Sequence, residues 1–69
     1  MSKISLSLAE NIKQMRKINR ISQDKLSKMA GITLHTITKI ESGATRDPRV
    51  KTVKKLAGAL GKSIDELLK

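Results

Sequence analysis

Several residue types are missing from this 69-residue chain or are rare in it. It has no Cys, Phe, Tyr or Trp, a single Pro, and only six Asp and Glu. Without cysteine, neither a disulfide framework nor a thiolate metal site can form, and a reducing compartment fits best. No apolar run is long enough for a signal peptide or a membrane span. We therefore expect a soluble, cytoplasmic protein with one domain over residues 1–69, of which residues 1–5 are expected to fray.

The charge of the chain is strongly one-sided. Fifteen Lys and Arg against six Asp and Glu give a formal net charge of +9. This excess indicates an anionic partner, although a solvated lysine surface would give the same composition. Proteins that bind single-stranded nucleic acids usually stack the bases on aromatic side chains, which this chain lacks. If the anion is a nucleic acid, a duplex is therefore the expected partner.

The sequence also lacks the residue patterns of catalytic and metal sites. Its carboxylates are scattered, and it has no Gly-rich phosphate loop and no nucleophile motif. The single histidine, His35, has Gly31 four residues before it and Lys39 four residues after it, so no second ligand stands at helical spacing. We therefore expect no enzymatic activity, no cofactor and no bound metal.

Capping residues and apolar spacing predict five short helices. The first is expected to begin at Ser7, because Ser7-Leu8-Ala9-Glu10 reads as a capping box. The second is expected to follow an N-cap at Ser22 and to stop at Gly31. A fourth helix can open at Pro48, and a second capping box at Ser63 opens the fifth. The apolar residues that recur at helical spacing are Leu8, Ile12, Met15, Leu26, Met29, Ala30, Ile37, Ile40, Val50, Val53, Leu56, Ala57, Leu60, Ile64, Leu67 and Leu68.

The segment GITLHTITKIESG, residues 31–43, looks at first like a strand. Its β-branched residues favour a strand, but a strand needs a partner, and no other convincing strand occurs in the chain. Thr33 is a good N-cap just after the helix stop at Gly31, and Ile37 and Ile40 fall on one side of a helix that would end at Ser42. We therefore predict a third helix over residues 33–42.

With these helices in place, residues 22–43, SQDKLSKMAGITLHTITKIESG, resemble the helix-turn-helix of the phage repressor and Cro (XRE-like) family of DNA-binding domains. The resemblance implies an all-α, five-helix, lambda-repressor-like domain that binds double-stranded DNA. One departure is Ser27, where such proteins usually carry Ala or Gly. Its hydroxyl can bond to the carbonyl four residues earlier, which leaves the fold in place. Further matching positions are Gln23, Leu26, Ala30, Gly31, Ile32, Ile37, Ile40, Glu41, Ser42, Gly43, Pro48, Leu56, Ala57, Leu60, Gly61 and residues 64–68.

In this family the second motif helix enters the major groove, and its exposed N-terminal residues meet base edges. A step of 100° per residue around Ile37 places His35 and Lys39 away from the buried side of the helix, with Leu34 and Thr36 flanking it. We therefore expect Leu34, His35, Thr36 and Lys39 to read bases. The competing interpretations are that Leu34 is a core residue and that Lys39 contacts a phosphate.

The resemblance also implies contacts with the DNA backbone and an ion pair. The pair is expected between Arg16 and Glu41, and it would hold the recognition helix against the scaffold. The segments near residues 47–50 and 58–61 resemble the surfaces through which family members dimerise, so we expect a homodimer on an inverted repeat, at least on DNA. The residues expected to contact the DNA backbone are Gln23, Thr33, Ser42, Arg46, Arg49 and Lys51.

The predicted function is that of a sequence-specific transcriptional regulator, most simply a repressor, acting in the cytoplasm on the nucleoid. Two alternatives bind DNA as well: the antitoxin of a toxin–antitoxin pair and the controller protein of a restriction–modification operon. An alternative from another class is a helical protein-interaction module that does not bind DNA and has an unidentified protein partner.

Overall fold

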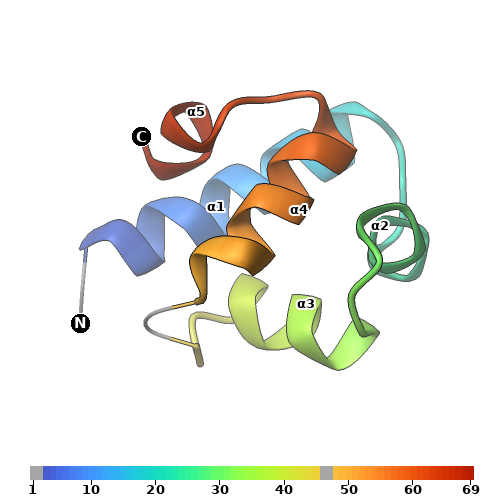
Figure 1. Ribbon diagram of the computed structural model, residues 1–69, viewed down its shortest axis with the longest axis horizontal. Helices are drawn as coiled ribbons and strands as arrows, with labels where there is room; N and C mark the ends of the chain where they lie inside the picture. The colour runs from blue at the N-terminus through green and yellow to red at the C-terminus, as the bar shows by residue number, and fades with distance from the viewer. Residues whose placement is uncertain (1–2, 46–47) are drawn as a thin grey trace.

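The regular structure of the chain is helical wherever the computed structural model describes it, which is over residues 3–45 and 48–69 (Figure 1). Five helices follow one another in these ranges: α1 (Lys3–Ile18), α2 (Gln23–Ala30), α3 (Leu34–Glu41), α4 (Val50–Leu60) and α5 (Ile64–Leu68). The predicted all-α fold is confirmed. In the same two ranges, no helix combines the length and the apolar character that a membrane span needs.

Helix α1 begins earlier than the sequence predicts. The expected start at Ser7 is wrong, because the helix runs through Ser7 from Lys3. Residues 3–18 contain neither Gly nor Pro, so nothing interrupts the backbone hydrogen bonds before Asn19. Residues 3–5, for which fraying is expected, are helical, and residues 1–2 lie outside the described residues. Beyond α1, Arg20 has a φ of 57°, a left-handed conformation that costs a non-glycine residue about 1 kcal/mol.

Hydroxyl caps begin the next two helices. The side chain of Ser22 accepts a hydrogen bond from the backbone N of Lys25 (3.0 Å), and that of Thr33 accepts one from the backbone N of Thr36 (3.1 Å). Each bond satisfies a donor in a first helical turn that would otherwise lack a partner. Between the caps, Gly31 ends α2 with a φ of 70°, where a side chain would be strained. These caps and the burial of one side of α3 outweigh its β-branched composition, so the strand-like segment is a helix.

Ser27 lies in the interior of α2 and is 5% exposed. Its Oγ donates a hydrogen bond to the carbonyl of Asp24 at 2.6 Å. The acceptor is thus the carbonyl three residues earlier, and the expected bond to the carbonyl four residues earlier is wrong. The bond satisfies the hydroxyl inside the helix, and this explains how Ser replaces a smaller residue there.

Helix α4 begins two residues after the only proline. Arg49, its N-cap, has an extended backbone (φ −65°, ψ 145°), so the helix opens at Val50 and not at Pro48 as expected. The predicted capping box of α5 is present. The backbone N of Glu66 donates to Ser63 Oγ, and the backbone N of Ser63 donates to Glu66 Oε1, both at 3.1 Å. This reciprocal pair stabilises a helix of only five residues.

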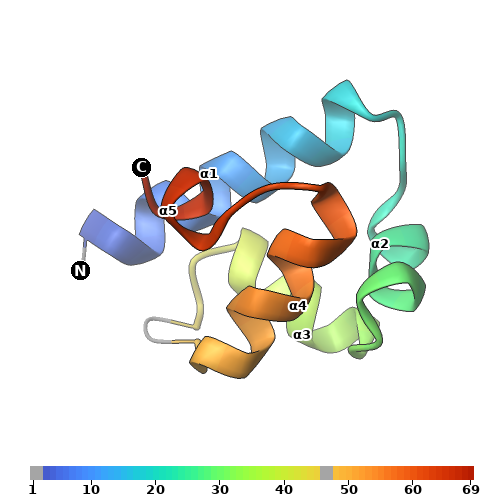
Figure 2. The same cartoon turned by 45° about the horizontal axis from the view of Figure 1, so that its top comes forward.

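An aliphatic core joins the helices: α1 packs against α3 and α5, and α2 packs against α3 and α4 (Figure 2). Met29 and Val50 recur at helical spacing with the core residues, but they are 48% and 70% exposed. Both lie at the edge of the apolar arc of their helix, where the neighbouring helices do not cover them. The buried apolar residues are Leu8, Ala9, Ile12, Leu26, Ala30, Ile37, Ile40, Val53, Leu56, Ala57, Leu60 and Leu67.

Candidate nucleic-acid interface

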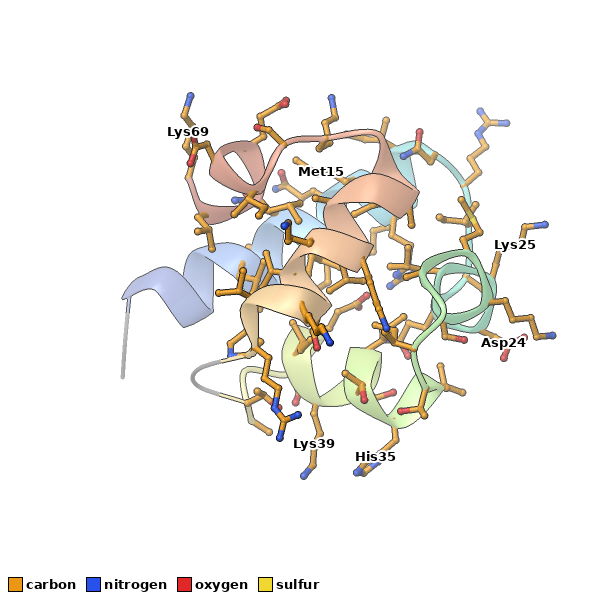
Figure 3. The ribbon with its side chains drawn as sticks, viewed as in Figure 1. Met15, Asp24, Lys25, His35, Lys39 and Lys69 are labelled. Carbon is orange, nitrogen blue, oxygen red and sulfur yellow. The ribbon has the colours of Figure 1, made fainter. Side chains whose placement is uncertain are left out.

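Helix α3 has one side in the core and one side in solvent. Ile37 and Ile40 are 1% and 2% exposed, whereas His35 and Lys39 are exposed. Figure 3 shows the side chains of His35 and Lys39 projecting from the same edge of the molecule, opposite to Lys69. The major groove of B-DNA admits an α-helix, and a helix presented in this way can place its outer side chains against base edges.

Leu34 and Thr36 flank this outer side in different environments. Leu34, the first residue of α3, is 44% exposed and therefore is not a core residue. Thr36 is half-buried, and its Oγ1 lies 2.8 Å from that of Thr33. One hydroxyl proton makes this hydrogen bond, so the second proton of the pair remains available for an outside acceptor.

The hydroxyls farther along α3 are used within the helix. Thr38 Oγ1 donates to the carbonyl of Leu34 at 3.0 Å. Ser42 Oγ donates to the carbonyl of Lys39 at 3.0 Å and accepts from the backbone N of Ala44 at 3.3 Å. Ser42 therefore closes the C-terminal end of α3, and its hydroxyl would have to leave the Lys39 carbonyl before it could donate to a phosphate.

The last residue of α3, Glu41, is an acid that is only 3% exposed. Arg16 Nε donates to Glu41 Oε2 at 2.9 Å, and Arg16 Nη2 donates to Glu41 Oε1 at 3.0 Å. Arg16 Nη1 also donates to the carbonyl of Ile21 at 3.1 Å. The structure thus contains a bidentate ion pair between the two residues, and this pair ties the end of α3 to α1 and to the connection that follows α1.

Gln23, the first residue of α2, joins the same cluster. Its Nε2 donates to Glu41 Oε1 at 2.9 Å. Residue spacing cannot reveal this bond, because the two residues are 18 positions apart and meet only through the packing of α2 on α3. The other Nε2 proton of Gln23 remains for the expected contact with the DNA backbone, which stays a prediction.

Opposing influences act on the ionisation of Glu41. Burial, the largest single influence, raises the pKa of its carboxyl. The hydrogen bonds from Arg16 and Gln23, together with the positive charges of Arg16 and Lys13, lower it by more, so the pKa of Glu41 lies below its usual value. The hydrogen bond to Glu41 in turn raises the pKa of Arg16. Both groups are therefore charged at neutral pH.

This shift predicts a specific dependence of stability on pH. In an unfolded chain, the pKa of a glutamate is about 4.3. Because the pKa of Glu41 is lower in the folded state, the carboxylate contributes stability above the unfolded pKa and loses it as the pH falls through the folded pKa. We expect the free energy of unfolding to drop between about pH 5 and pH 3, and to drop less steeply in Glu41→Gln. Urea unfolding at several pH values measures both slopes, and equal slopes would contradict the expectation.

Glu66 also contributes to the loss of stability over this pH range, so a separate variant is required to measure its share. Hydrogen bonds from the backbone and the side chain of Ser63 lower the pKa of the Glu66 carboxyl, so its effect has the same sign. A Glu66→Gln variant, in which Glu41 is intact, separates the two contributions.

Basic residues follow α3 in the chain. Arg49 is the N-cap of α4 and Lys51 lies in its first turn, and both are exposed. Arg46 lies outside the described residues. The sequence has no acidic residue between Asp47 and Asp65. Helix α4 therefore contains no carboxylate of its own, and its start, with Arg49 and Lys51, is suited to an anion.

The motif geometry and a match to a known family agree. Residues 12–67 match the family described as Helix-turn-helix, a span that includes the C-terminal part of α1, all of α2, α3 and α4, and nearly all of α5. The chain therefore belongs to the helix-turn-helix family of the phage repressor and Cro type.

Similarity to a curated protein extends over a large part of the chain. Over 59 residues the chain is 30% identical to an uncharacterized HTH-type transcriptional regulator, RghRB, of Bacillus subtilis strain 168. The alignment covers 86% of this chain but 42% of RghRB. The chain thus spans less than half the length of that relative.

Solved structures share the fold. The hypothetical transcription factor NHTF from Neisseria superposes with a TM-score of 0.90 at 22% identity, over all of this chain and 80% of the other. Hydroxypropylphosphonic acid epoxidase from S. wedmorenis superposes with a TM-score of 0.87 at 25% identity, over all of this chain but 36% of the enzyme. The first likeness shows the fold alone, and the second compares this fold with a minor part of an enzyme chain.

Proposed function

We propose that this protein binds double-stranded DNA in a sequence-specific way as a transcriptional regulator, most simply a repressor, with residues 33–42 in the major groove. The observation that carries the proposal is the two-sided α3, whose inner side is buried while His35 and Lys39 project outward. Membership of the helix-turn-helix family and the name of the B. subtilis relative support the same function. Because the chain spans 42% of that relative, the proposal concerns the DNA-binding part of such a regulator.

Base reading is proposed for four residues on the outer side of α3. Lys39 can donate to guanine O6 and N7, and Leu34 and the Thr36 methyl can contact a thymine methyl. His35 can donate or accept a hydrogen bond. One good base contact contributes about 1–3 kcal/mol of discrimination, so few contacts suffice for a preferred site.

Most of the affinity is proposed to come from phosphates, as is usual for DNA-binding proteins. Residues near the start of α2 and on either side of α3 would hold the DNA backbone in register with the bases. The residues assigned to this role are Gln23, Thr33, Ser42, Arg46, Arg49 and Lys51.

Two copies are proposed to bind an inverted repeat with half-sites about one helical turn apart. The proposed contact surface includes residues 48–50 and 58–61, and Asp47, which was expected to join it, lies outside the described residues. Exposed Val50 supplies apolar area on this surface. Such a protein would act on the nucleoid in the cytoplasm.

Selection of bound sites from random duplex DNA at moderate salt tests the proposed function. We expect a short inverted repeat to emerge and its affinity to fall steeply with salt, with a log-log slope of about −0.9 for each neutralised phosphate. If no duplex is enriched and every DNA binds only in the millimolar range at low salt, the protein-interaction module is the better description.

A matched pair of charge variants tests the proposed backbone contacts. Arg49→Gln with Lys51→Gln and Lys62→Gln with Lys69→Gln each remove two positive charges, but Lys69 lies opposite to Lys39 and His35 (Figure 3). The first pair should reduce the magnitude of the salt slope by about 0.9 for each lost phosphate contact, and the second should leave it unchanged. Equal reductions by both pairs would mean that only net charge matters.

A further inference from the structure

Gln23 is bound to α3 before any DNA is present, and its amide has a fixed orientation. An ionised carboxylate only accepts hydrogen bonds, so the amide must turn Nε2 toward Glu41, where the distance to Oε1 is 2.9 Å. Arg16 holds the same carboxylate through two further bonds. The acceptor is therefore held in place, and the orientation of the Gln23 side chain follows from it.

The other end of the Gln23 amide also faces α3. Its Oε1 lies 3.5 Å from Thr38 Oγ1, whose proton is donated to the nearer carbonyl of Leu34. Thr38 directly precedes Lys39, and Glu41 follows Lys39 by two positions. Gln23 thus spans the turn of α3 that carries Lys39.

We propose that Gln23 is a positioning residue for base reading, which sets the orientation of the Lys39 turn of α3 through its bond to Glu41. The proposal rests on the proposed DNA-binding function and adds a role that a phosphate contact does not have. A phosphate contact carries no sequence information, so its loss weakens all DNA sites equally. Loss of a positioning residue changes the ratios of the affinities for different DNA sites, because the distance between Lys39 and its base is no longer fixed.

The test compares Gln23→Ala with two other variants on the selected site and on its single base-pair substitutions. Lys39→Ala identifies the base position that depends on Lys39. Lys25→Ala is the matched control, because Lys25 lies in the first turn of α2 but projects away from the molecule on the far side of that helix (Figure 3). We expect Gln23→Ala to lose about 5-fold of discrimination at the Lys39 position, near the lower end of what one base contact contributes. Lys25→Ala should leave every ratio unchanged, and an equal loss at all sites in Gln23→Ala overturns the proposal.

A measurement on the parent protein without DNA keeps the proposal testable even if Gln23→Ala unfolds. In an NMR spectrum, the side-chain NH₂ of Gln23 should exchange with solvent more slowly than that of Gln14, which is exposed on α1. Equal exchange of Gln23 and Gln14 in the parent would overturn the inference and leave the DNA-binding proposal standing. Slow exchange in a parent that binds no DNA would overturn the DNA-binding proposal and leave the hydrogen bond standing.

Discussion

Ile37→Ala is expected to lower the free energy of unfolding by about 3 kcal/mol, within the range for removing a large aliphatic side chain from a core. Ile37 is 1% exposed and lies in the aliphatic core from the inner side of α3. The substitution removes its contacts and leaves a cavity, which closely packed neighbours fill only in part. A core of this size supplies about 3–5 kcal/mol in total, so about 0–2 kcal/mol would remain and a measurable fraction of the variant should be unfolded at room temperature.

Leu34→Ala is the matched control, because it removes as many carbon atoms from the same helix. Leu34 is 44% exposed, so its loss should cost less than about 1 kcal/mol of stability while weakening DNA binding. Urea unfolding followed by circular dichroism measures the loss of stability in Ile37→Ala and in Leu34→Ala. Equal losses of stability in the two variants would contradict the division of α3 into a core side and an outer side.

Glu41→Ala should have the second large effect, a loss of about 3 kcal/mol. The variant leaves the Arg16 guanidinium, whose side chain is 15% exposed, without its carboxylate partner. It also leaves the Nε2 of Gln23 without the acceptor that it has at 2.9 Å. The cost of a buried donor that loses its partner is larger than the net gain from the bond that it made.

Glu10→Ala provides the control for an ion pair in solvent. Glu10 and Lys13 are 3.9 Å apart and their side chains are 65% and 38% exposed, so breaking this pair should cost less than about 1 kcal/mol. Thermal unfolding of the two alanine variants beside the parent gives the comparison. If Glu41→Ala is no more destabilised than Glu10→Ala, the Arg16 and Glu41 pair does not hold α3 in place.

Local signals in the sequence predict most of the fold. Gly31 and Gly61 mark helix ends, and Ser22, Thr33 and Ser63 mark helix starts, because each acts through its own backbone or through residues three positions away. The wrong prediction that α1 begins at Ser7 also came from a local signal. A capping box is favourable only where the chain turns, and the residues before Ser7 continue the helix instead.

The candidate site is predictable only in part. A 100° step identifies His35 and Lys39 as outward residues, because that property depends on one helix alone. The exposure of Met29 and Val50 depends on how far the neighbouring helices reach, which a helical wheel does not contain. The bond between Gln23 and Glu41 depends on the relative placement of two helices to within an ångström, and no pattern in the chain reports it.

The cluster around Glu41 has a consequence for how such a protein could change its target during evolution. Arg16, Glu41 and Gln23 orient α3 through bonds on its inner side and at its end, whereas His35 and Lys39 lie on its outer side. Substitutions at outward positions therefore leave the packing intact and usually change stability by less than about 0.5 kcal/mol. A gene duplicate could thus acquire a new operator by drift at a few exposed codons, and the same positions are where a library for retargeting should be randomised.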